Sequence, residues 1–324
     1  MAEVGLGTYT NVPGYVSPDW ERKLPLFTNW DELELSDRVL KMALASPQTE
    51  PPPYAEHVYE GILYTNWMPR ESLEAMKTFE IRDDDVVLVS YPKSGVNWMF
   101  EIVRRILDEN KENSVLTGPE FHYHGQRPCH VQLRERPSPR LMYTHLPFQL
   151  APPGLTTPVN KVKVIVVLRN PKDVCVSWYY FAKKNQELKA EGTWEQYTEK
   201  FLDGKVICGG HLDNVMGWWQ MKDDPHFLFV KYEDMNKDFR SSVKTIAAFL
   251  EKELTDEHLA LILNSCRLES MRKTLEESGT WRKDIVRKGI VGDWKNHFSA
   301  EESARFDQKY RERMAGTGLE FDFE

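Results

Sequence analysis

A lysine, a serine and a glycine follow a short apolar run near residue 90 of this 324-residue chain. Val86–Val89 has the composition of a buried strand, and Tyr91–Trp98 (YPKSGVNW) leads from it into a segment with helical apolar spacing. Amides at the start of a helix attract anions. Gly95 lets the backbone approach a ligand closely, and Lys93 adds a mobile positive charge. The order of residue types predicts an anion site, with phosphate as the expected anion.

The loop differs from a Walker A phosphate loop, in which the lysine follows the last glycine; here Lys93 precedes Gly95. A strand-to-helix turn with a solvated lysine is the alternative interpretation.

A second junction of this kind carries an arginine. Val162–Leu168 is the most apolar strand candidate, and Arg169 follows it directly. Asn170 suits a helix N-cap and Pro171 the first helical position, which places Ser177 in the next helix. Arg169 and Ser177 could bind the same anion, or Arg169 could be a surface ion-pair partner.

Two other segments offer chemistry. His145 follows the strand candidate Arg140–Thr144, and ligands of open α/β sheets bind at strand ends, so His145 is either a functional base or a packed histidine. Arg287, Lys288 and Gly289 open RKGIVGDWKNHFS, which could fold over an anion or form an exposed basic loop.

The segment FHYHGQRPCH, with His122, His124, Cys129 and His130, could hold a metal, but its spacing matches no ligand motif. An aromatic loop that faces the substrate is the other interpretation, and we predict no metal.

Alternating strand and helix candidates position these groups. A further strand candidate is Phe227–Tyr232, and amphipathic helices are expected around Trp194–Phe201, Leu212–Trp219 and Val243–Leu250. This alternation predicts one α/β domain with a central parallel sheet flanked by helices.

Composition limits the partners and the compartment. A net charge of −8 argues against a broad nucleic-acid surface, and the apolar runs are too short for a bilayer span. The four cysteines lack paired spacing and no signal peptide is evident, which favours a reducing, cytoplasmic setting. Proline-rich residues 1–53 are expected to form an N-terminal extension, partly irregular, with one short helix near Trp30–Leu44, and residues 54–324 the domain.

From about Tyr54 onward the chain resembles the cytosolic sulfotransferases, in the content and order of three motifs. YPKSGVNW is similar to the family's 5′-phosphosulfate loop, RNPKDVCVS to its 3′-phosphate motif, and RKGIVGDWKNHFS to its C-terminal signature. Residues 59–85 and Asn97 resemble the sixth vertebrate-type family more than they resemble the phenol or steroid groups.

The resemblance implies 3′-phosphoadenosine 5′-phosphosulfate (PAPS) as co-substrate, 3′-phosphoadenosine 5′-phosphate (PAP) as product, no metal, and a small-molecule acceptor. It implies His145 as general base, with Lys93 and Ser177 also at the reacting centre. The residues implied to bind the nucleotide are Lys93, Ser94, Gly95, Val96, Asn97, Trp98, Arg169, Ser177, Tyr232, Cys266, Leu268, Arg287, Lys288 and Gly289.

Three positions and one motif depart from the family pattern. Tyr143 stands where a lysine is usual, Val96 replaces a threonine and Leu268 a phenylalanine. The usual dimerisation motif is altered at residues 295–304, which predicts a monomer or a non-standard dimer.

The expected function is therefore sulfuryl transfer from PAPS to a hydroxyl or amine. A phosphotransferase of the P-loop type is an alternative, but the chain lacks a GK[ST] sequence. A nucleotide-binding protein with decayed catalysis is the other alternative, suggested by Tyr143 and Val96.

Overall fold

A computed structural model describes residues 56–107, 116–123, 126–185, 188, 192–277 and 287–324. Residues 52–324 form one compact unit. The predicted extension at residues 1–53 lies outside the described residues, as does its predicted helix, so the division into extension and domain stays a prediction.

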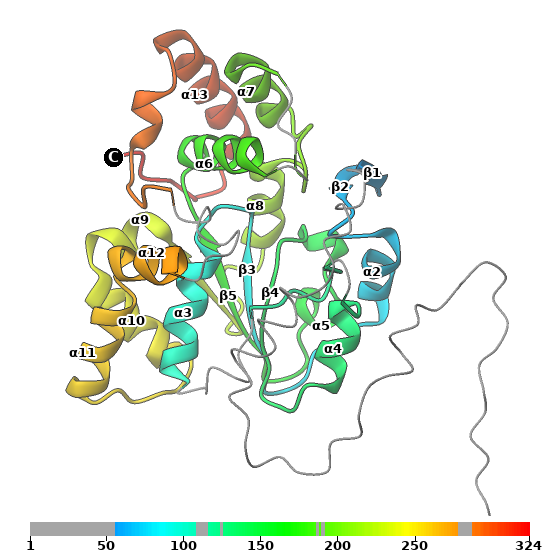
Figure 1. The fold of residues 1–324 in the computed structure, drawn as a ribbon, viewed down its shortest axis with the longest axis vertical. Coiled ribbons are helices and arrows are strands. Elements are labelled where there is room, and N and C mark those ends of the chain that lie inside the picture. Colours follow the sequence, from blue (N-terminus) through cyan, green and yellow to red (C-terminus); the bar gives the residue numbers. More distant parts are fainter. Residues whose placement is uncertain (1–55, 108–115, 124–125, 186–187, 189–191, 278–286) are drawn as a thin grey trace, which may run out of the picture. The chain divides into compact units, whose positions relative to one another are not determined.

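Four parallel strands form the centre of the fold (Figure 1). They are β3 (Val86–Ser90), β4 (Leu141–Thr144), β5 (Lys163–Leu168) and β6 (Phe227–Lys231), in the order β4-β3-β5-β6. Every residue of β3 and β4 is buried, as expected of parallel strands covered on both faces. A small antiparallel hairpin, β1 (Glu56–Tyr59) and β2 (Ile62–Thr65), lies apart from this sheet.

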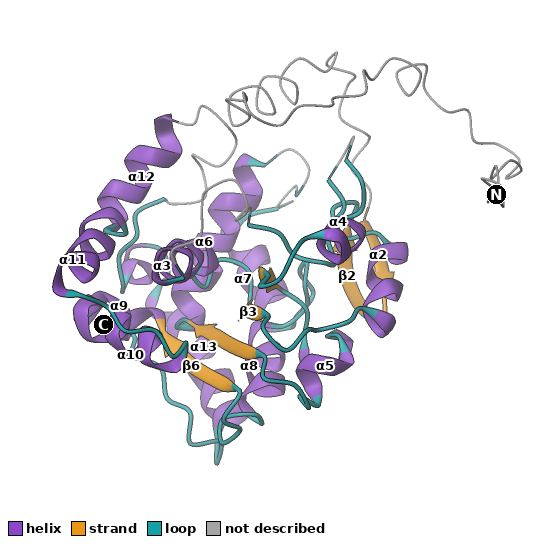
Figure 2. Ribbon diagram, turned by 90° about the horizontal axis from the view of Figure 1, so that it is seen from below, coloured by secondary structure: helices purple, strands orange, loops and turns teal. Residues whose placement is uncertain are grey.

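Helices flank the sheet, and the groups α10–α12 and α2, α4 and α5 lie on opposite sides of it in both views (Figures 1 and 2). The α-helices are α2 (Arg70–Ala75), α3 (Val96–Ile106), α4 (Cys129–Glu135), α5 (Pro153–Thr156), α6 (Pro171–Lys184), α7 (Trp194–Leu202), α8 (His211–Trp219), α9 (Tyr232–Lys237), α10 (Phe239–Phe249), α11 (Asp256–Ser265), α12 (Leu268–Glu277) and α13 (Ala300–Met314). The 3₁₀-helices are η2 (Met76–Thr78), η3 (Phe148–Leu150) and η5 (Asp293–Asn296).

The strand order brings three loops together. β3 pairs with β4 on one side and with β5 on the other, so the carboxyl ends of all three strands are neighbours. The chain leaves these ends at residues 91, 145 and 169, which are the three places where the sequence predicts binding or catalytic groups. This is the edge at which open α/β sheets bind ligands.

The predicted parallel sheet and its strands are confirmed, with boundaries shifted by a residue or two. Asn170 caps α6 as predicted, because its side chain accepts from the amide of Asp173, and Pro171 is the first helical residue. The segment before Pro69 forms the β1–β2 hairpin. Among the described residues, no helix combines the length and the apolar character that a membrane crossing requires.

Candidate active site

A cavity, called here the central cavity, lies at the carboxyl ends of β3, β4 and β5. Its lining includes most of the residues predicted to bind or react, namely Lys93, Gly95, Val96, Asn97, Trp98, His145, Arg169, Ser177, Tyr232, Arg287, Lys288 and Gly289. The lining does not include Ser94, Cys266 or Leu268.

The loop before α3 has the backbone that an anion site needs. Gly95 has a φ of 113°, and a Cβ there would lie 2.9 Å from Cδ2 of Tyr232, so both conformation and space require glycine. The first amides of α3 have no acceptor within the helix and lie at its positive end. Lys93 is half-buried, with its Nζ 4.0 Å from the centre of the Phe181 ring. This placement differs from the alternative of a fully solvated lysine.

Arg169 joins three parts of the site. Its guanidinium donates to the carbonyl oxygen of Lys93 at 3.0 Å and to that of Ile290 at 3.3 Å, and its centre lies 4.3 Å from the Tyr232 ring. The side chain is buried, and its Nε has no hydrogen-bond partner among the described residues. Arg169 therefore connects the loop before α3 with the segment that contains Ile290, which differs from a surface ion-pair role.

Asp293 organises the basic residues of the C-terminal segment. Its carboxylate pairs with Arg287, with Lys288 at 2.7 Å and with His297 at 3.2 Å, so these three side chains converge on it. Burial alone would raise the pKa of Asp293, but hydrogen bonds from Lys288, Asn296 and Arg287 hold it well below its usual range. Asp293 therefore stays ionised and keeps the two cations at the cavity.

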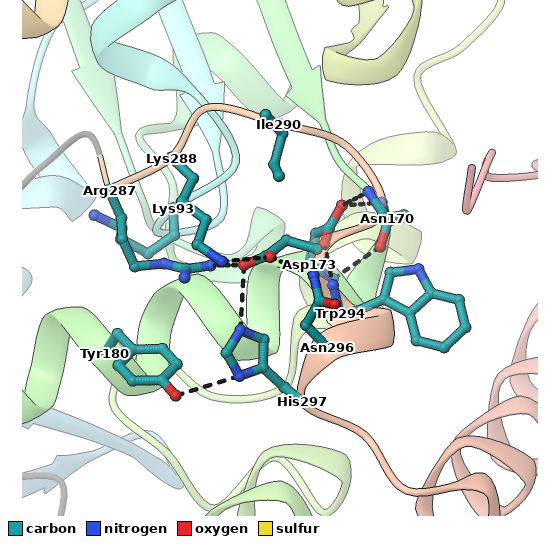
Figure 3. A network of polar contacts seen from close by, with 12 residues as sticks. Lys93, Asn170, Asp173, Tyr180, Arg287, Lys288, Ile290, Trp294, Asn296 and His297 are labelled. Carbon is teal, nitrogen blue, oxygen red and sulfur yellow. Dashed lines mark hydrogen bonds and ion pairs between the residues drawn. The ribbon is translucent and has the colours of Figure 1, made fainter.

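Asp173 holds the same segment from the side of α6. Its two carboxylate oxygens accept from the amides of Gly292 at 2.8 Å and Trp294 at 3.0 Å (Figure 3). Asn170 also donates to Asp173. The helix that follows Arg169 is in this way tied to the segment that carries Arg287 and Lys288.

Trp98 forms an aromatic part of the cavity wall. Its indole donates to the carbonyl oxygen of Cys266 at 2.7 Å, and its ring meets Tyr232 edge-on with centroids 5.3 Å apart. Cys266 thus contacts Trp98 through its backbone, its thiol is buried, and it does not line the cavity, so its predicted contact with the nucleotide stays a prediction. Leu268 begins α12, and its side chain lies outside what the structure describes.

His145 also lines the cavity. Its Nδ1 is 2.6 Å from the carbonyl oxygen of Ser90, so Nδ1 carries the proton and donates, which leaves the Nε2 lone pair as the basic site. Burial lowers the pKa of His145 to about 4; the bond to Ser90 opposes this effect and the charge of Lys93 adds to it. The imidazole is therefore neutral at pH 7 and can accept a proton.

Aromatic side chains surround His145. The rings of Tyr143 and Phe121 meet it edge-on, with centroids 5.0 and 6.1 Å away, and Tyr123 stacks on Phe121. The hydroxyls of Tyr123 and Tyr143 are 3.3 Å apart. Phe121, Tyr123 and Tyr143 line the cavity, which favours the aromatic-loop interpretation of residues 121–130. Within the described residues, no cluster of three or more histidine, cysteine or acidic side chains could hold a metal ion.

Sequence reasoning missed the acidic residues of the site. Asp293 belongs to RKGIVGDWKNHFS, the segment that the sequence already indicated as a candidate anion site, but the sequence did not show which side chains pair with it. Glu120 is fully buried and accepts from the amide of His145 at 2.8 Å, although 25 residues separate the two in sequence. A lone glutamate in the stretch Gly118–Phe121 was the only signal for it.

Comparison with known proteins agrees with this geometry. The family model described as "Sulfotransferase domain" matches residues 83–318. The rabbit (Oryctolagus cuniculus) amine sulfotransferase is 40% identical over 266 residues, which cover 77% of this chain and 87% of that protein. Zebrafish (Danio rerio) sulfotransferase 6B1 is 36% identical over 264 residues, 80% of this chain and 88% of that protein.

Among solved structures, mouse sulfotransferase SULT7A1 complexed with PAP has a TM-score of 0.73 and 34% identity, and the match covers 81% of this chain and 94% of that one. A retinol dehydratase complex has a TM-score of 0.69 at 22% identity, covering 83% and 93%, and supports the fold alone. The phosphotransferase alternative has no support in these matches. Fold, motif order and sequence identity together show that this chain belongs to the sulfotransferase family, whose enzymes transfer a sulfuryl group from PAPS to an acceptor.

Proposed function

We propose that this chain transfers a sulfuryl group from PAPS to a hydroxyl or amine of a small-molecule acceptor, with His145 as the general base. One observation carries the assignment: the unprotonated Nε2 of a neutral histidine and the ammonium of Lys93 belong to one cavity that also contains Arg169, Arg287 and Lys288. A base and a cluster of cations in one cavity suit in-line transfer to a hydroxyl from a phosphate leaving group.

The residues present fit the nucleotide. The buried atoms Ser94 Oγ, Arg169 Nε and Arg287 Nε have no hydrogen-bond partner among the described residues, and buried donors of this kind need one. Phosphate oxygens would supply acceptors for them. The loop at Lys93–Asn97 would hold the 5′ side, and Arg169, Ser177, Arg287, Lys288 and Gly289 the 3′-phosphate. Trp98, Tyr232, Cys266 and Leu268 would contact the adenine.

PAPS supplies the sulfuryl group and a phosphate that can leave with its negative charge. His145 would take the acceptor's proton at Nε2, with the ring held by the Nδ1 bond to Ser90. Lys93 and the amides of Gly95 and Val96 would stabilise the negative charge that develops on the leaving oxygen. Ser177 lies on α6 at the cavity wall and would hold the 3′-phosphate, which orients the nucleotide for this transfer.

Apart from the predicted nucleotide-binding residues, the cavity lining is mostly apolar and aromatic. It includes Trp67, Met68, Leu116, Phe121, Tyr123, Tyr143, Leu188 and Ile207. This lining favours a largely apolar acceptor that carries one reactive hydroxyl or amine.

Three further proposals concern the whole protein. The cytosol is its proposed location, supported by four cysteines that are all free and buried. A monomer or a non-standard dimer is proposed because Ser299, in the altered dimer motif, caps α13 through a capping box with Glu302. Residues 54–324 are proposed to carry the activity.

The test is an assay of sulfated product with PAPS and a panel of phenols, steroids, bile alcohols and amines, using wild type, His145→Ala and His258→Ala. His258 is the matched control because it lies on α11 and bonds to the carbonyl of Arg105, outside the cavity lining. His145→Ala should lower turnover about 10²–10⁴-fold, because it removes general base catalysis. His258→Ala should leave turnover unchanged.

PAP binding, measured as a rise in melting temperature without Mg²⁺, should survive in all three proteins. Undiminished turnover of His145→Ala with every acceptor would remove the base assignment. PAP binding by wild type without turnover of any acceptor would instead indicate a nucleotide-binding protein with decayed catalysis.

A further inference from the structure

Glu120 is a fully buried carboxyl that does not line the central cavity. In the sequence, Glu120 belongs to the segment that connects α3 to α4. Its side chain reaches the carboxyl end of β4. There Oε1 accepts from the hydroxyl of Thr144 at 3.1 Å and from the backbone amide of His145 at 2.8 Å. Glu120 is thus bonded to the main chain of the proposed base, with no contact of its own to the cavity.

The bonds around Glu120 fix the turn that follows β4. Thr144 gives its hydroxyl proton to Glu120 and accepts from the amide of Leu146 at 3.1 Å, so one carboxyl oxygen restrains three successive residues. The imidazole of His145 is then held separately at Nδ1 by Ser90. Backbone and ring are both restrained, and Nε2 is left to react.

The segment that carries Glu120 is closely fitted to β4. The amide of Tyr143 donates to the carbonyl oxygen of Thr117 at 3.1 Å. A Cβ at Gly118 would lie 2.8 Å from the carbonyl oxygen of Tyr143 and 3.0 Å from Oε2 of Glu120, so only glycine fits without a shift. The carboxyl is therefore presented to the strand end by a rigid support.

This arrangement is unfavourable for stability alone. Oε2 of Glu120 is buried and has no hydrogen-bond partner among the described residues. The titratable groups that interact with it are hydroxyls and thiols, those of Tyr64, Cys129, Tyr143 and Cys208, whose own pKa values are raised by burial. None of these four can supply a compensating positive charge. Buried, incompletely paired polar groups tend to be kept where function requires them.

We propose that Glu120 is a positioning residue for the general base: by accepting from Thr144 and from the amide of His145, it holds the end of β4 so that Nε2 of His145 faces the acceptor. The inference rests on the proposed function of His145. It predicts that Glu120 affects turnover through His145 and leaves nucleotide binding unchanged.

The chain contains a natural comparison. Glu233 is also fully buried, and its Oε2 also has no partner among the described residues. Its Oε1 accepts from the amide of Asn170 at 2.8 Å, just beyond the end of β5. Two buried glutamates thus brace the ends of the two strands that flank β3, Glu120 at β4 on the side of the base and Glu233 at β5 beside Arg169. Replacement of Glu233 should therefore weaken PAP binding, which Glu120 should not affect.

The experiment measures turnover at saturating PAPS, and PAP binding, for Glu120→Met, Glu120→Gln, His145→Ala, Glu120→Met/His145→Ala and Glu233→Met. Methionine has a similar length but no acceptor oxygen, whereas glutamine keeps one. Loss of the hydrogen bond that supports a metal ligand costs about 10–100-fold in affinity or activity, and we expect a loss of the same order for a supported base. We expect Glu120→Met to lower turnover by that factor with PAP binding unchanged, and Glu120→Gln to stay within about fivefold of wild type.

The double variant separates positioning from general support of the fold. If Glu120 acts through His145, adding Glu120→Met to His145→Ala should lower turnover by no more than about a further twofold. The reason is that the effects of substitutions at interacting residues do not add. If Glu120→Met does not fold, Thr144→Val removes the hydroxyl from the same network and enters the same cycle with His145→Ala.

Near-normal turnover of Glu120→Met would overturn the proposal, as would a full additional loss in the His145→Ala background. The proposal would also be overturned if Glu120→Gln and Glu120→Met lowered turnover equally. It would be overturned as well if Glu120→Met lost PAP binding to the extent expected for Glu233→Met. These failures differ from failure of the proposed function, in which His145→Ala itself would keep its turnover.

Discussion

The pH dependence of catalysis follows from the burial of His145. An imidazole in water has a pKa near 6.5 and loses most of its basic form by pH 5.5. In this protein, burial lowers the pKa of His145 to about 4, so the neutral form persists. We therefore expect kcat/KM to stay level well below pH 6.5, where a solvent-exposed histidine would fail.

The two cases differ by a measurable factor. At pH 5.5, a base with a pKa of about 4 is roughly 97% neutral, whereas a base with a pKa of about 6.5 is roughly 9% neutral. Relative to pH 7.5, kcat/KM should fall less than about 1.2-fold in the first case and about tenfold in the second. A loss would begin only as the pH approaches 4, because protonation then removes the lone pair on Nε2.

The assay uses an aliphatic alcohol as acceptor, because an alcohol does not titrate in this range. Each sample is returned to pH 7.5 to show that activity recovers. The titration of Glu120 must be controlled for, because burial raises its pKa to about 7, which lies between the two assay values of pH 5.5 and pH 7.5. Glu120→Gln removes that titration and leaves His145 in place. A tenfold fall at pH 5.5 that persists in Glu120→Gln would refute the argument from burial.

Four further outcomes are expected. Arg169→Ala should weaken PAP binding about ten- to a hundredfold, because it removes a charged hydrogen bond to the 3′-phosphate. Binding of adenosine 5′-monophosphate, which lacks that phosphate, should change little in a calorimetric titration. Equal losses for both nucleotides would mean that the bonds of Arg169 to Lys93 and Ile290 matter most. Tyr143→Phe should change turnover less than about threefold, because the Tyr143 hydroxyl is shared with Tyr123; a large fall at unchanged acceptor KM would make it catalytic. Burial lowers the pKa of His211 to about 3 in the folded protein. As pH falls from about 6.5 toward 3, His211 is protonated in the unfolded chain but not in the folded one, so the free energy of unfolding decreases. Relative to wild type, the free energy of unfolding of His211→Phe should therefore be higher at pH 5 than at pH 7.5 by about 2 kcal/mol in denaturant titrations. An equal difference from wild type at both pH values would refute this. Light scattering at micromolar concentration should show a monomer, or a dimer insensitive to substitution at Ser299; a tight dimer lost on that substitution would contradict the proposal.

Local patterns predicted the parts of the site that depend on neighbours in sequence. The apolar run before Tyr91 and the helical spacing after Trp98 define a strand, a loop and a helix, and the structure has β3 and α3 there. Asn170 and Pro171 were identifiable as a cap because capping acts within three residues. The same reasoning placed His145 and Arg169 at strand ends, and the sheet order puts these two ends on either side of β3.

The missing parts depend on contacts between distant residues. Glu120 and His145 are 25 residues apart, and no periodicity links a buried glutamate to the amide it binds. Asp173 binds the amides of Gly292 and Trp294 across about 120 residues, so the sequence showed it only as an acidic residue in the first turn of α6. The β1–β2 hairpin was missed because its turn at Glu60 and Gly61 lacks the usual Asn-Gly or Asp-Gly signal.

The acidic residues explain how an acidic protein keeps a cationic cavity assembled. Arg287 and Lys288 would repel each other, but both pair with Asp293, which is buried and stays ionised because its pKa is held well below the usual range. The carboxylate therefore fixes both cations before a ligand arrives, which reduces the ordering cost of binding. Arg287 keeps one buried donor, Nε, without a partner among the described residues. A phosphate can then bind to groups that are already in place, and Asp293 need not be displaced for that contact to form.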